Sequence, residues 1–194
     1  TWRPRYATGR EMVAVTDHFH GYPRPDGSAG TRNYVAVIAS VICSTKPVEE
    51  IAARVPGAIA VVHPLGCAQV GDDLRQTRRS LTGMEMNPNV EAALIVGLGC
   101  ENNQPAELAA LIDAPKPLDV IGIQALGGSD KVVEAGCRIA GEWAEAARRA
   151  PRVELPLAAL NLGVLCLEGD GPGAARALQA VGELVDACVA AGAR

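Results

Sequence analysis

A series of nearly continuous apolar, β-branched runs, separated by helical patterns, constrains the fold more than any other feature. The clearest run is NYVAVIASVIC at residues 33–43, which reads as a strand buried on both faces. Similar runs lie at residues 57–63, 90–100, 118–124 and 157–166, and helical patterns at 45–55, 71–84, 105–112, 129–150 and 173–191. This alternation predicts an α/β fold: a doubly wound, mainly five-stranded parallel sheet with helices on both faces, flavodoxin- or Rossmann-like, in strand order 2-1-3-4-5.

The chain of 194 residues is long enough for one domain with a substantial core. Residues 1–32 contain two Pro-Arg pairs and the string DHFHGYPRPDG, which predict an irregular N-terminal arm. Residues 33–194 are then expected to form a single α/β domain. The final AGAR follows a complete helical pattern and reads as a natural end.

Charge and composition exclude several partners. The net charge of −4 disfavours nucleic acid and anionic membranes, and aromatic residues, at 3%, are too few for base stacking. No apolar stretch approaches the roughly 20 residues of a membrane helix, and the N-terminus lacks the apolar core of a signal peptide. Six cysteines without a secreted framework predict a cytoplasmic protein.

Cysteines follow four of the five predicted strands. Because ligands bind at the carboxyl ends of parallel strands, Cys43, Cys67, Cys100 and Cys166 are expected on one rim of the sheet. Four thiols there could hold a soft metal or an iron–sulfur cluster, or one could act as a nucleophile. The alternative is that small residues simply suit tight turns. Cys137 and Cys188 fall within helices and are expected to be small buried side chains.

Two further residues at the predicted rim are candidates for acid–base chemistry. His63 ends the second strand and could be a general base or a metal ligand, or it could bind a loop carbonyl. Glu101 follows the third strand, where it could be catalytic or could complement the dipole of the next helix.

Two glycine-rich turns and a polar loop could bind an anionic ligand. Gly97-Leu98-Gly99 and Gly127-Gly128-Ser129 could each present backbone N–H groups to an anion. Neither completes a G-x-G-x-x-G pattern, so a dinucleotide is disfavoured, and no P-loop motif is present. The N-terminal arm carries Arg24, Asp26 and Arg32, and arginine forks bind carboxylates. A solvated loop would explain these residues equally well.

The order of several unusual strings resembles one enzyme family. FHGYPRPDGSAGTRNYVAVIASVICS, HPLGCAQ, LTGMEMNPNVEAALIVGLGCENNQ and IQALGG resemble the central domain of the altronate and galactarate dehydratases, and are also similar to the large subunit of a sulfolactate sulfo-lyase. The resemblance covers residues 19–128. It implies a lyase that eliminates water from a sugar acid, with iron or manganese as the divalent ion and an iron–sulfur cluster as an alternative.

The resemblance also implies roles for the residues that lie in these strings. It implies catalytic roles for His63, Cys67 and Glu101, without assigning the base to one of them. The metal that it implies would be held by the cysteines already expected on the rim, namely Cys43, Cys67, Cys100 and Cys166. The small carboxylic acid substrate would be bound by Arg24, Asp26, Arg32, Asn33, Gly127 and Gly128.

One segment departs from the family pattern. After the fifth predicted strand the family reads approximately CGGSDG, whereas this chain reads CLEGDG and then ends after one helix. The chain could be one subunit of an enzyme with a separate partner, a stand-alone family member with a reshaped or lost activity, or an excised part. A homo-oligomer or a separate partner subunit is expected. A binding or regulatory module without turnover is the main non-enzymatic alternative, and a nucleotide-binding protein is a third.

Overall fold

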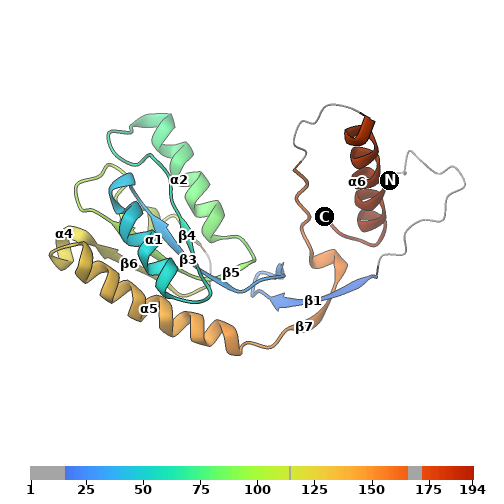
Figure 1. Ribbon diagram of the computed structural model, residues 1–194, viewed down its shortest axis with the longest axis horizontal. Helices are drawn as coiled ribbons and strands as arrows, with labels where there is room; N and C mark the ends of the chain where they lie inside the picture. The colour runs from blue at the N-terminus through green and yellow to red at the C-terminus, as the bar shows by residue number, and fades with distance from the viewer. Residues whose placement is uncertain (1–15, 114, 166–171) are drawn as a thin grey trace, which may run out of the picture. The chain divides into compact units, whose positions relative to one another are not determined.

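The computed structural model describes residues 16–113, 115–165 and 172–194, which divide into two compact units. One unit is Gly30–Pro151, and the other consists of the residues up to Ala29 and those from Arg152 onward (Figure 1). Residues 152–194 thus belong to a different unit from the strands before them, although the sequence pattern predicted one domain over residues 33–194.

The Gly30–Pro151 unit is built on a four-stranded sheet in the order β4-β3-β5-β6. Its strands are β3 (Tyr34–Ala39), β4 (Ala58–Val61), β5 (Val90–Gly97) and β6 (Leu118–Gly122), and all neighbouring pairs are parallel. This order is the first part of the predicted 2-1-3-4-5 series, and the α/β class is confirmed. Both central strands are almost completely buried, as their apolar runs require.

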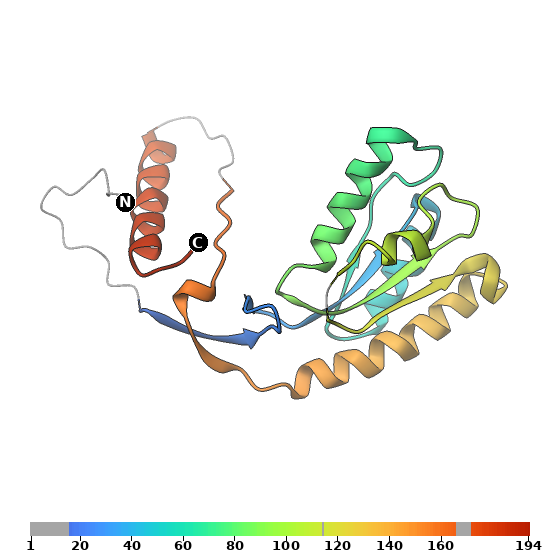
Figure 2. The same cartoon turned by 180° about the vertical axis from the view of Figure 1, so that it is seen from behind.

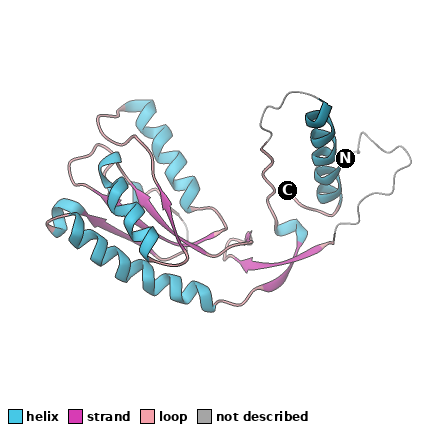
Figure 3. Cartoon of the chain, in the orientation of Figure 1, coloured by secondary structure: helices cyan, strands magenta, loops and turns pink. Residues whose placement is uncertain are grey.

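Helices cover both faces of this sheet, as expected for a doubly wound fold (Figures 2 and 3). The elements are η1 (Ile42–Ser44), α1 (Thr45–Arg54), α2 (Gly71–Glu85), α3 (Pro105–Ala109), α4 (Ile123–Leu126) and α5 (Ser129–Arg149). One core cluster packs α1 and α5 against alternate residues of β3 and β5. The other packs Leu81 of α2 and Leu108 of α3 against the remaining residues of the same strands.

Helix α5 is positioned by one close contact. Gly136 faces Ile51 of α1 so closely that a β-carbon at this position would lie 2.3 Å from the Ile51 Cδ1 atom. The charges of α5 match its dipole, with Asp130 in the first turn and Arg148 and Arg149 in the last. An amphipathic helix with a small residue at its crossing point therefore seals one face of the sheet.

The fifth predicted strand is wrong. The segment 157–166 begins with the short helix η2 (Leu157–Ala159), and its remaining described residues, up to 165, form no strand. Leu162, Val164 and Leu165 are 41%, 49% and 85% exposed, so this part of the apolar run forms neither a strand nor a part of the core. An apolar run alone does not specify a buried strand. Two backbone hydrogen bonds instead join Leu160 and Leu162 to Arg194 at the end of the chain.

The second unit contains a three-stranded sheet in the order β2-β1-β7 and a long helix, α6 (Pro172–Ala190). The strands are β1 (His18–Pro23), β2 (Ala29–Gly30) and β7 (Val153–Pro156). The sequence predicted an irregular arm over residues 1–32, but residues 18–23 and 29–30 form strands. They do so because β1 pairs with β7, which comes from a distant part of the sequence. No helix among the described residues is long and apolar enough to cross a membrane.

Candidate functional site

The strand order changes direction between β3 and β5, and ligands of open α/β sheets bind at the carboxyl ends of strands beside such a point. Three loops meet at this rim: residues 40–43 after β3, residues 62–70 after β4 and residues 98–104 after β5. Ile42 donates its N–H to the Leu65 carbonyl oxygen (2.9 Å), and the Asn103 N–H donates to the Gly66 carbonyl (3.1 Å). The three loops are thus bonded to one another.

Glu101 is the central side chain of the rim. It is 3% exposed, and its carboxylate oxygens accept hydrogen bonds from the Ser40 hydroxyl (2.9 Å) and the Leu98 N–H (2.9 Å), and from the Gly99 N–H (2.5 Å). The turn after β5 was predicted to cradle an anion with backbone N–H groups. It does so, and the anion is the carboxylate of the chain itself.

The same contacts decide the charge of Glu101. Burial raises the pKa of this carboxyl. The hydrogen bonds from the backbone N–H groups of Glu101 and Gly99, the Ser40 hydroxyl and the Leu98 N–H outweigh burial, so the pKa lies below its ordinary value. Glu101 therefore remains ionised at neutral pH and holds the turn that carries Cys100.

Two asparagines connect the rim loops. Asn103 is fully buried, donates from Nδ2 to the Ser40 carbonyl oxygen (2.9 Å) and accepts from Nε of Arg78 (3.1 Å). Asn102 accepts the N–H of Ala68 (2.8 Å) through its Oδ1 atom. The Asn102 bond to Ala68 and the Asn103 N–H bond to the Gly66 carbonyl lie on either side of Cys67, so the loop after β4 is fixed against the loop after β5.

Gly66 explains why this loop can lie so close to β3. Its φ of +97° is a left-handed conformation, and a β-carbon there would lie 2.3 Å from the Ser40 carbonyl oxygen and 2.8 Å from the Val41 Cα atom. Glycine at this position is therefore required by backbone conformation and by space.

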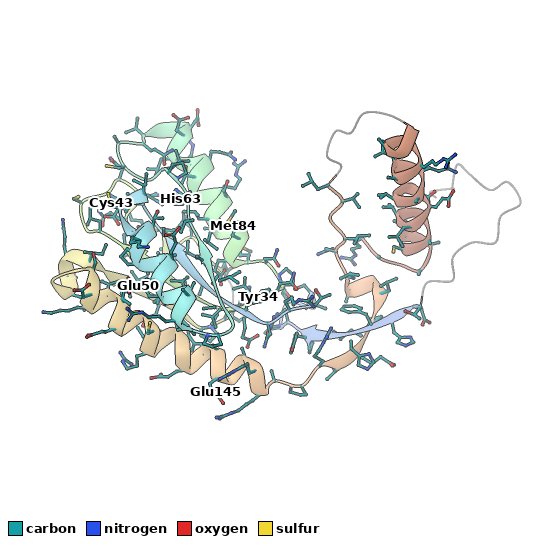
Figure 4. All side chains as sticks on the ribbon, viewed as in Figure 1. Tyr34, Cys43, Glu50, His63, Met84 and Glu145 are labelled. Atoms are coloured by element: carbon teal, nitrogen blue, oxygen red, sulfur yellow. The ribbon has the colours of Figure 1, made fainter. Side chains whose placement is uncertain are left out.

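His63 uses both ring nitrogens to hold the same loop. Nδ1 accepts the Leu65 N–H (3.1 Å), which assigns the proton to Nε2, and Nε2 then donates to the Ala39 carbonyl oxygen (2.9 Å). Figure 4 shows His63 and Cys43 toward the same end of the unit, away from Tyr34. In this arrangement neither ring nitrogen has a lone pair available for a substrate proton.

The predicted rim cysteines differ in accessibility from the other two. Cys43, Cys67 and Cys100 are exposed on the three rim loops, whereas Cys137 and Cys188 are half-buried in helices. Cys166 lies outside the described residues. Within the described parts of the chain, no three His, Cys, Asp or Glu side chains are gathered closely enough to hold a metal ion as they stand. These parts of the rim therefore do not fit a complete metal site.

Gly127 and Gly128 end the short helix α4. The Gly128 N–H donates to the Ile123 carbonyl oxygen (2.9 Å), and the Gly127 N–H donates to that of Gln124 (3.3 Å). Both glycines have positive φ, at +79° and +137°. The backbone N–H groups that were predicted to bind substrate thus terminate α4, which is a common helix-ending arrangement.

Arg32 and Asn33 lie at the opposite end of the sheet from the rim. They precede β3, whose six residues span about 20 Å, and the rim follows that strand. The N–H groups of Thr31 and Arg32 donate to Oδ1 of Asn89 (2.8 and 2.9 Å), and Asn33 donates from Nδ2 to the Ala147 carbonyl (3.0 Å). Within this unit, the two residues anchor the start of β3 and do not reach the other predicted site residues.

Arg24 and Asp26 belong to the other unit, in the turn between β1 and β2. Asp26 accepts hydrogen bonds from the N–H (2.9 Å) and the hydroxyl (2.7 Å) of Ser28. The Arg24 N–H donates to the Ser28 carbonyl oxygen (2.9 Å), and the residue is buried, at 9% exposure. Both residues shape this turn.

Sequence reasoning did not predict which polar residues join the loops, namely Ser40, Arg78, Asn102 and Asn103. A signal was available, because a serine ends an otherwise apolar strand and two asparagines follow Glu101 directly. Short polar side chains at such positions are suited to bonding backbone groups of neighbouring loops.

A small apolar pocket of about 140 Å³ lies beside the rim, between the end of the edge strand β4 and helix α2. It is lined by Val61, Val62, His63, Leu65, Gln76, Thr77, Ser80, Leu81 and Met84. A hydroxylated acid would find few polar partners there, so the pocket does not match a sugar-acid site.

Comparison with known families identifies the region that contains the rim. Residues 21–148 match the family described as D-galactarate dehydratase/altronate hydrolase, second domain. This region runs from β1 through almost all of α5, and thus includes every strand of the four-stranded sheet.

Three curated proteins show the same relationship over most of this chain. Altronate dehydratase of Bacillus subtilis is 29% identical, covering 90% of this chain and 37% of the relative, and that of Escherichia coli is 29% identical, covering 88% and 36%. The beta subunit of (2R)-sulfolactate sulfo-lyase of Chromohalobacter salexigens is 30% identical, covering 87% and 43%. The chain therefore spans less than half the length of these relatives.

Proposed function

Since the chain belongs to the D-galactarate dehydratase/altronate hydrolase family, through the second domain of these enzymes, we propose that it is the α/β part of a lyase that eliminates water from a sugar acid such as altronate or galactarate. The observation that carries this proposal is the family match over the whole sheet. The network of bonded loops at the switch point supports it, because this is where an α/β sheet places a ligand.

The proposed reaction is a β-elimination. A base removes the proton on the carbon next to the substrate carboxylate, and the hydroxyl group on the following carbon leaves with a proton as water. The resulting enol becomes a 2-keto-3-deoxy acid by proton transfer to carbon. Such a reaction needs a base, an acid for the leaving hydroxyl and stabilisation of the charge that develops on the carboxylate.

The contacts favour different roles for the three predicted catalytic residues. Cys67 is exposed between the two residues that Asn103 and Asn102 hold, so its thiol is available to a ligand. The polar atoms of His63 and Glu101 are hydrogen-bonded to groups of the chain itself, and we assign these two residues to positioning the loops. Either residue would have to break existing hydrogen bonds to take a substrate proton.

We propose that a divalent metal, iron or manganese, supports the reaction in the whole enzyme by acting as a Lewis acid, with an iron–sulfur cluster as an alternative. The exposed thiols of Cys43, Cys67 and Cys100 would each need donors from Cys166 or from a polypeptide beyond this chain. Elemental analysis of protein purified without air tests this proposal. Near-stoichiometric iron or manganese would support it. A protein that contains no metal, and whose activity is not increased by any added metal, would contradict it.

A further polypeptide is part of this proposal. More than half the length of each of these three relatives lies outside the region that this chain covers, and one relative is by name a beta subunit. We propose that the active site of this protein is completed by a partner subunit or by another copy of the chain.

The test is an activity assay that follows formation of 2-keto-3-deoxy acid from altronate and from galactarate. The assay compares the chain alone with the chain mixed with the remaining domains of the Bacillus subtilis relative, produced separately. Turnover by the chain alone or by the mixture that is lost in Cys67→Ser, but retained in Cys188→Ser, a half-buried cysteine away from the rim, would support the proposal. Absence of turnover with both acids, by the chain alone and by the mixture, with iron or manganese added to each, would overturn it.

A binding module without turnover is the second candidate, and one observation favours it. The predicted acid–base residues His63 and Glu101 bond to groups of the chain itself, so neither is free to move a substrate proton as it stands. Thermal stabilisation of the chain by a sugar acid, with no turnover by the chain alone or by the mixture, would select this candidate.

A further inference from the structure

Strand β1 carries two of the three histidines of the chain, and they lie on one face of the β1–β7 ribbon. Residues two apart in a strand point to the same side of a sheet, which places His18 and His20 together. Both side chains are exposed, while Phe19 and Gly21 between and after them are more buried. The ribbon therefore presents two imidazoles to solvent with the spacing His-x-His.

A carboxylate lies beside these histidines on the neighbouring strand. Glu154 of β7 is the register partner of His20, and paired residues of antiparallel strands share a face with β-carbons about 5 Å apart. The Nε2 atom of His18 already lies 3.7 Å from Oε2 of Glu154. We propose that His18, His20 and Glu154 form a binding site for a divalent transition-metal ion.

The chemistry of the three side chains matches such an ion. Two imidazoles and one carboxylate are a donor set for zinc and for ferrous iron, and they leave open positions for water or for an oxygen ligand. As they stand, these three side chains, like every other set of three His, Cys, Asp or Glu residues in the described parts of the chain, are not close enough together to hold an ion. His18 and Glu154 are 47% and 65% exposed, so rotation of surface side chains can close the set without moving the packed core.

A second carboxylate orients the first ligand. Oδ1 of Asp17 lies 2.9 Å from Nδ1 of His18, which directs Nε2 of the same ring toward Glu154. A carboxylate bonded to the distal nitrogen of a metal-binding histidine is a common supporting contact, because it fixes the ring and makes it a better donor. The nearby cation, Arg152, is engaged by the Tyr22 ring at 5.9 Å and by the His20 carbonyl oxygen.

The site lies in the second unit and is independent of the lyase proposal, so either can fail without the other.

The rim thiols would also bind a soft metal, and the experiment has to remove them. Zn²⁺ is titrated by calorimetry into the full chain carrying Cys43→Ser, Cys67→Ser, Cys100→Ser and Cys166→Ser, after chelator treatment and at pH 7.5. One ion per chain is expected. His18→Gln and His20→Gln are each expected to weaken Zn²⁺ binding by at least about tenfold. Removing a residue that only supports a ligand already costs about this much, so removing a ligand should cost no less.

His63→Gln is the matched control, because His63 is the remaining histidine of the chain and bonds only to backbone groups in the contacts described. It should leave the Zn²⁺ affinity unchanged, with circular dichroism used to verify that each variant is folded. Failure to bind Zn²⁺, equal binding by all variants, or one ion per two chains would each overturn the proposed site.

Discussion

Two carboxylates are buried at opposite ends of the Gly30–Pro151 unit, and they differ in their hydrogen bonds and in the direction of their pKa shifts. Glu101, at the carboxyl end of the sheet, receives hydrogen bonds from Ser40, Leu98 and Gly99. Glu85, in the last turn of α2, is 0% exposed, and neither of its carboxylate oxygens has a hydrogen-bond partner among the described residues. Burial raises the pKa of Glu85, and Lys116 lowers it by a smaller amount, whereas the pKa of Glu101 is lowered.

The contrast shows how the sheet distributes charge. Strand ends and turns at the carboxyl end direct backbone N–H groups and a hydroxyl at one point, so a negative charge is stable there. At the amino end, the nearby cation bonds to carbonyl oxygens instead: the Lys116 ammonium donates to the carbonyls of Glu85 (2.8 Å) and Asn87 (3.2 Å). The rim is thus built around an anion, and the opposite end keeps an acid whose ionised form is disfavoured.

The largest predicted effect comes from neutralising the rim carboxylate. Glu101→Gln is expected to lower the free energy of unfolding by about 3 kcal/mol, because the amide cannot accept all the donors that converge there. Urea denaturation at pH 7 measures this loss. The control is Glu142→Gln on the exposed surface of α5, where a change within about 0.5 kcal/mol is expected.

The pH dependence gives this prediction its sign. Because the pKa of Glu101 is lower in the folded state, its stabilisation is present above the unfolded pKa and is lost as the pH falls through the folded pKa. The difference between the wild type and Glu101→Gln should therefore shrink in acid. A constant difference from pH 7 to acid would contradict the role given to the carboxylate.

The sequence predicted those parts of the fold that depend on local patterns of residues. Apolar runs were enough to find β3, β4, β5 and β6, since a buried parallel strand needs such a run, whereas their order was taken from the usual arrangement of a doubly wound fold. The segment 157–166 misled the prediction because an apolar run does not specify a strand partner. The pairing of β1 with β7 joins residues more than 130 positions apart, and no local signal encodes it.

The sequence predicted where the candidate site lies, but not what each of its residues does. The sequence placed His63, Cys67, Cys100 and Glu101 on one rim, and their loops are bonded to one another. It could not show that His63 and Glu101 have their polar atoms occupied, because the partners are backbone groups that any residue carries. Arg32 and Asn33 were assigned to substrate by resemblance, although β3 separates them from the rim.

The buried acid at the other end should give the reverse pH dependence. Because the pKa of Glu85 is raised in the folded state, folding is expected to lose stability as the pH increases from the unfolded pKa, about 4.3, through the folded pKa. The expected loss is about 1–2 kcal/mol, typical of a buried polar group without a partner. Thermal unfolding from pH 4.5 to 8.5 should show a decline in the wild type that Glu85→Gln reduces. An unchanged decline in Glu85→Gln would assign it to another group.

The smallest expected effect concerns Lys116, which bonds to carbonyl oxygens at the end of α2 and whose charge acts on Glu85. Lys116→Met keeps much of the side-chain length but removes the ammonium that caps the Glu85 and Asn87 carbonyls, with an expected loss of about 0.5–1 kcal/mol. It also removes the positive field that lowers the pKa of Glu85, so the decline in stability should extend to higher pH than in the wild type. In the double variant Glu85→Gln/Lys116→Met this extension should vanish while the loss of capping remains. If the two substitutions instead act additively at every pH, Lys116 does not act on Glu85, and the amino end of the sheet lacks the charge coupling that distinguishes it from the rim.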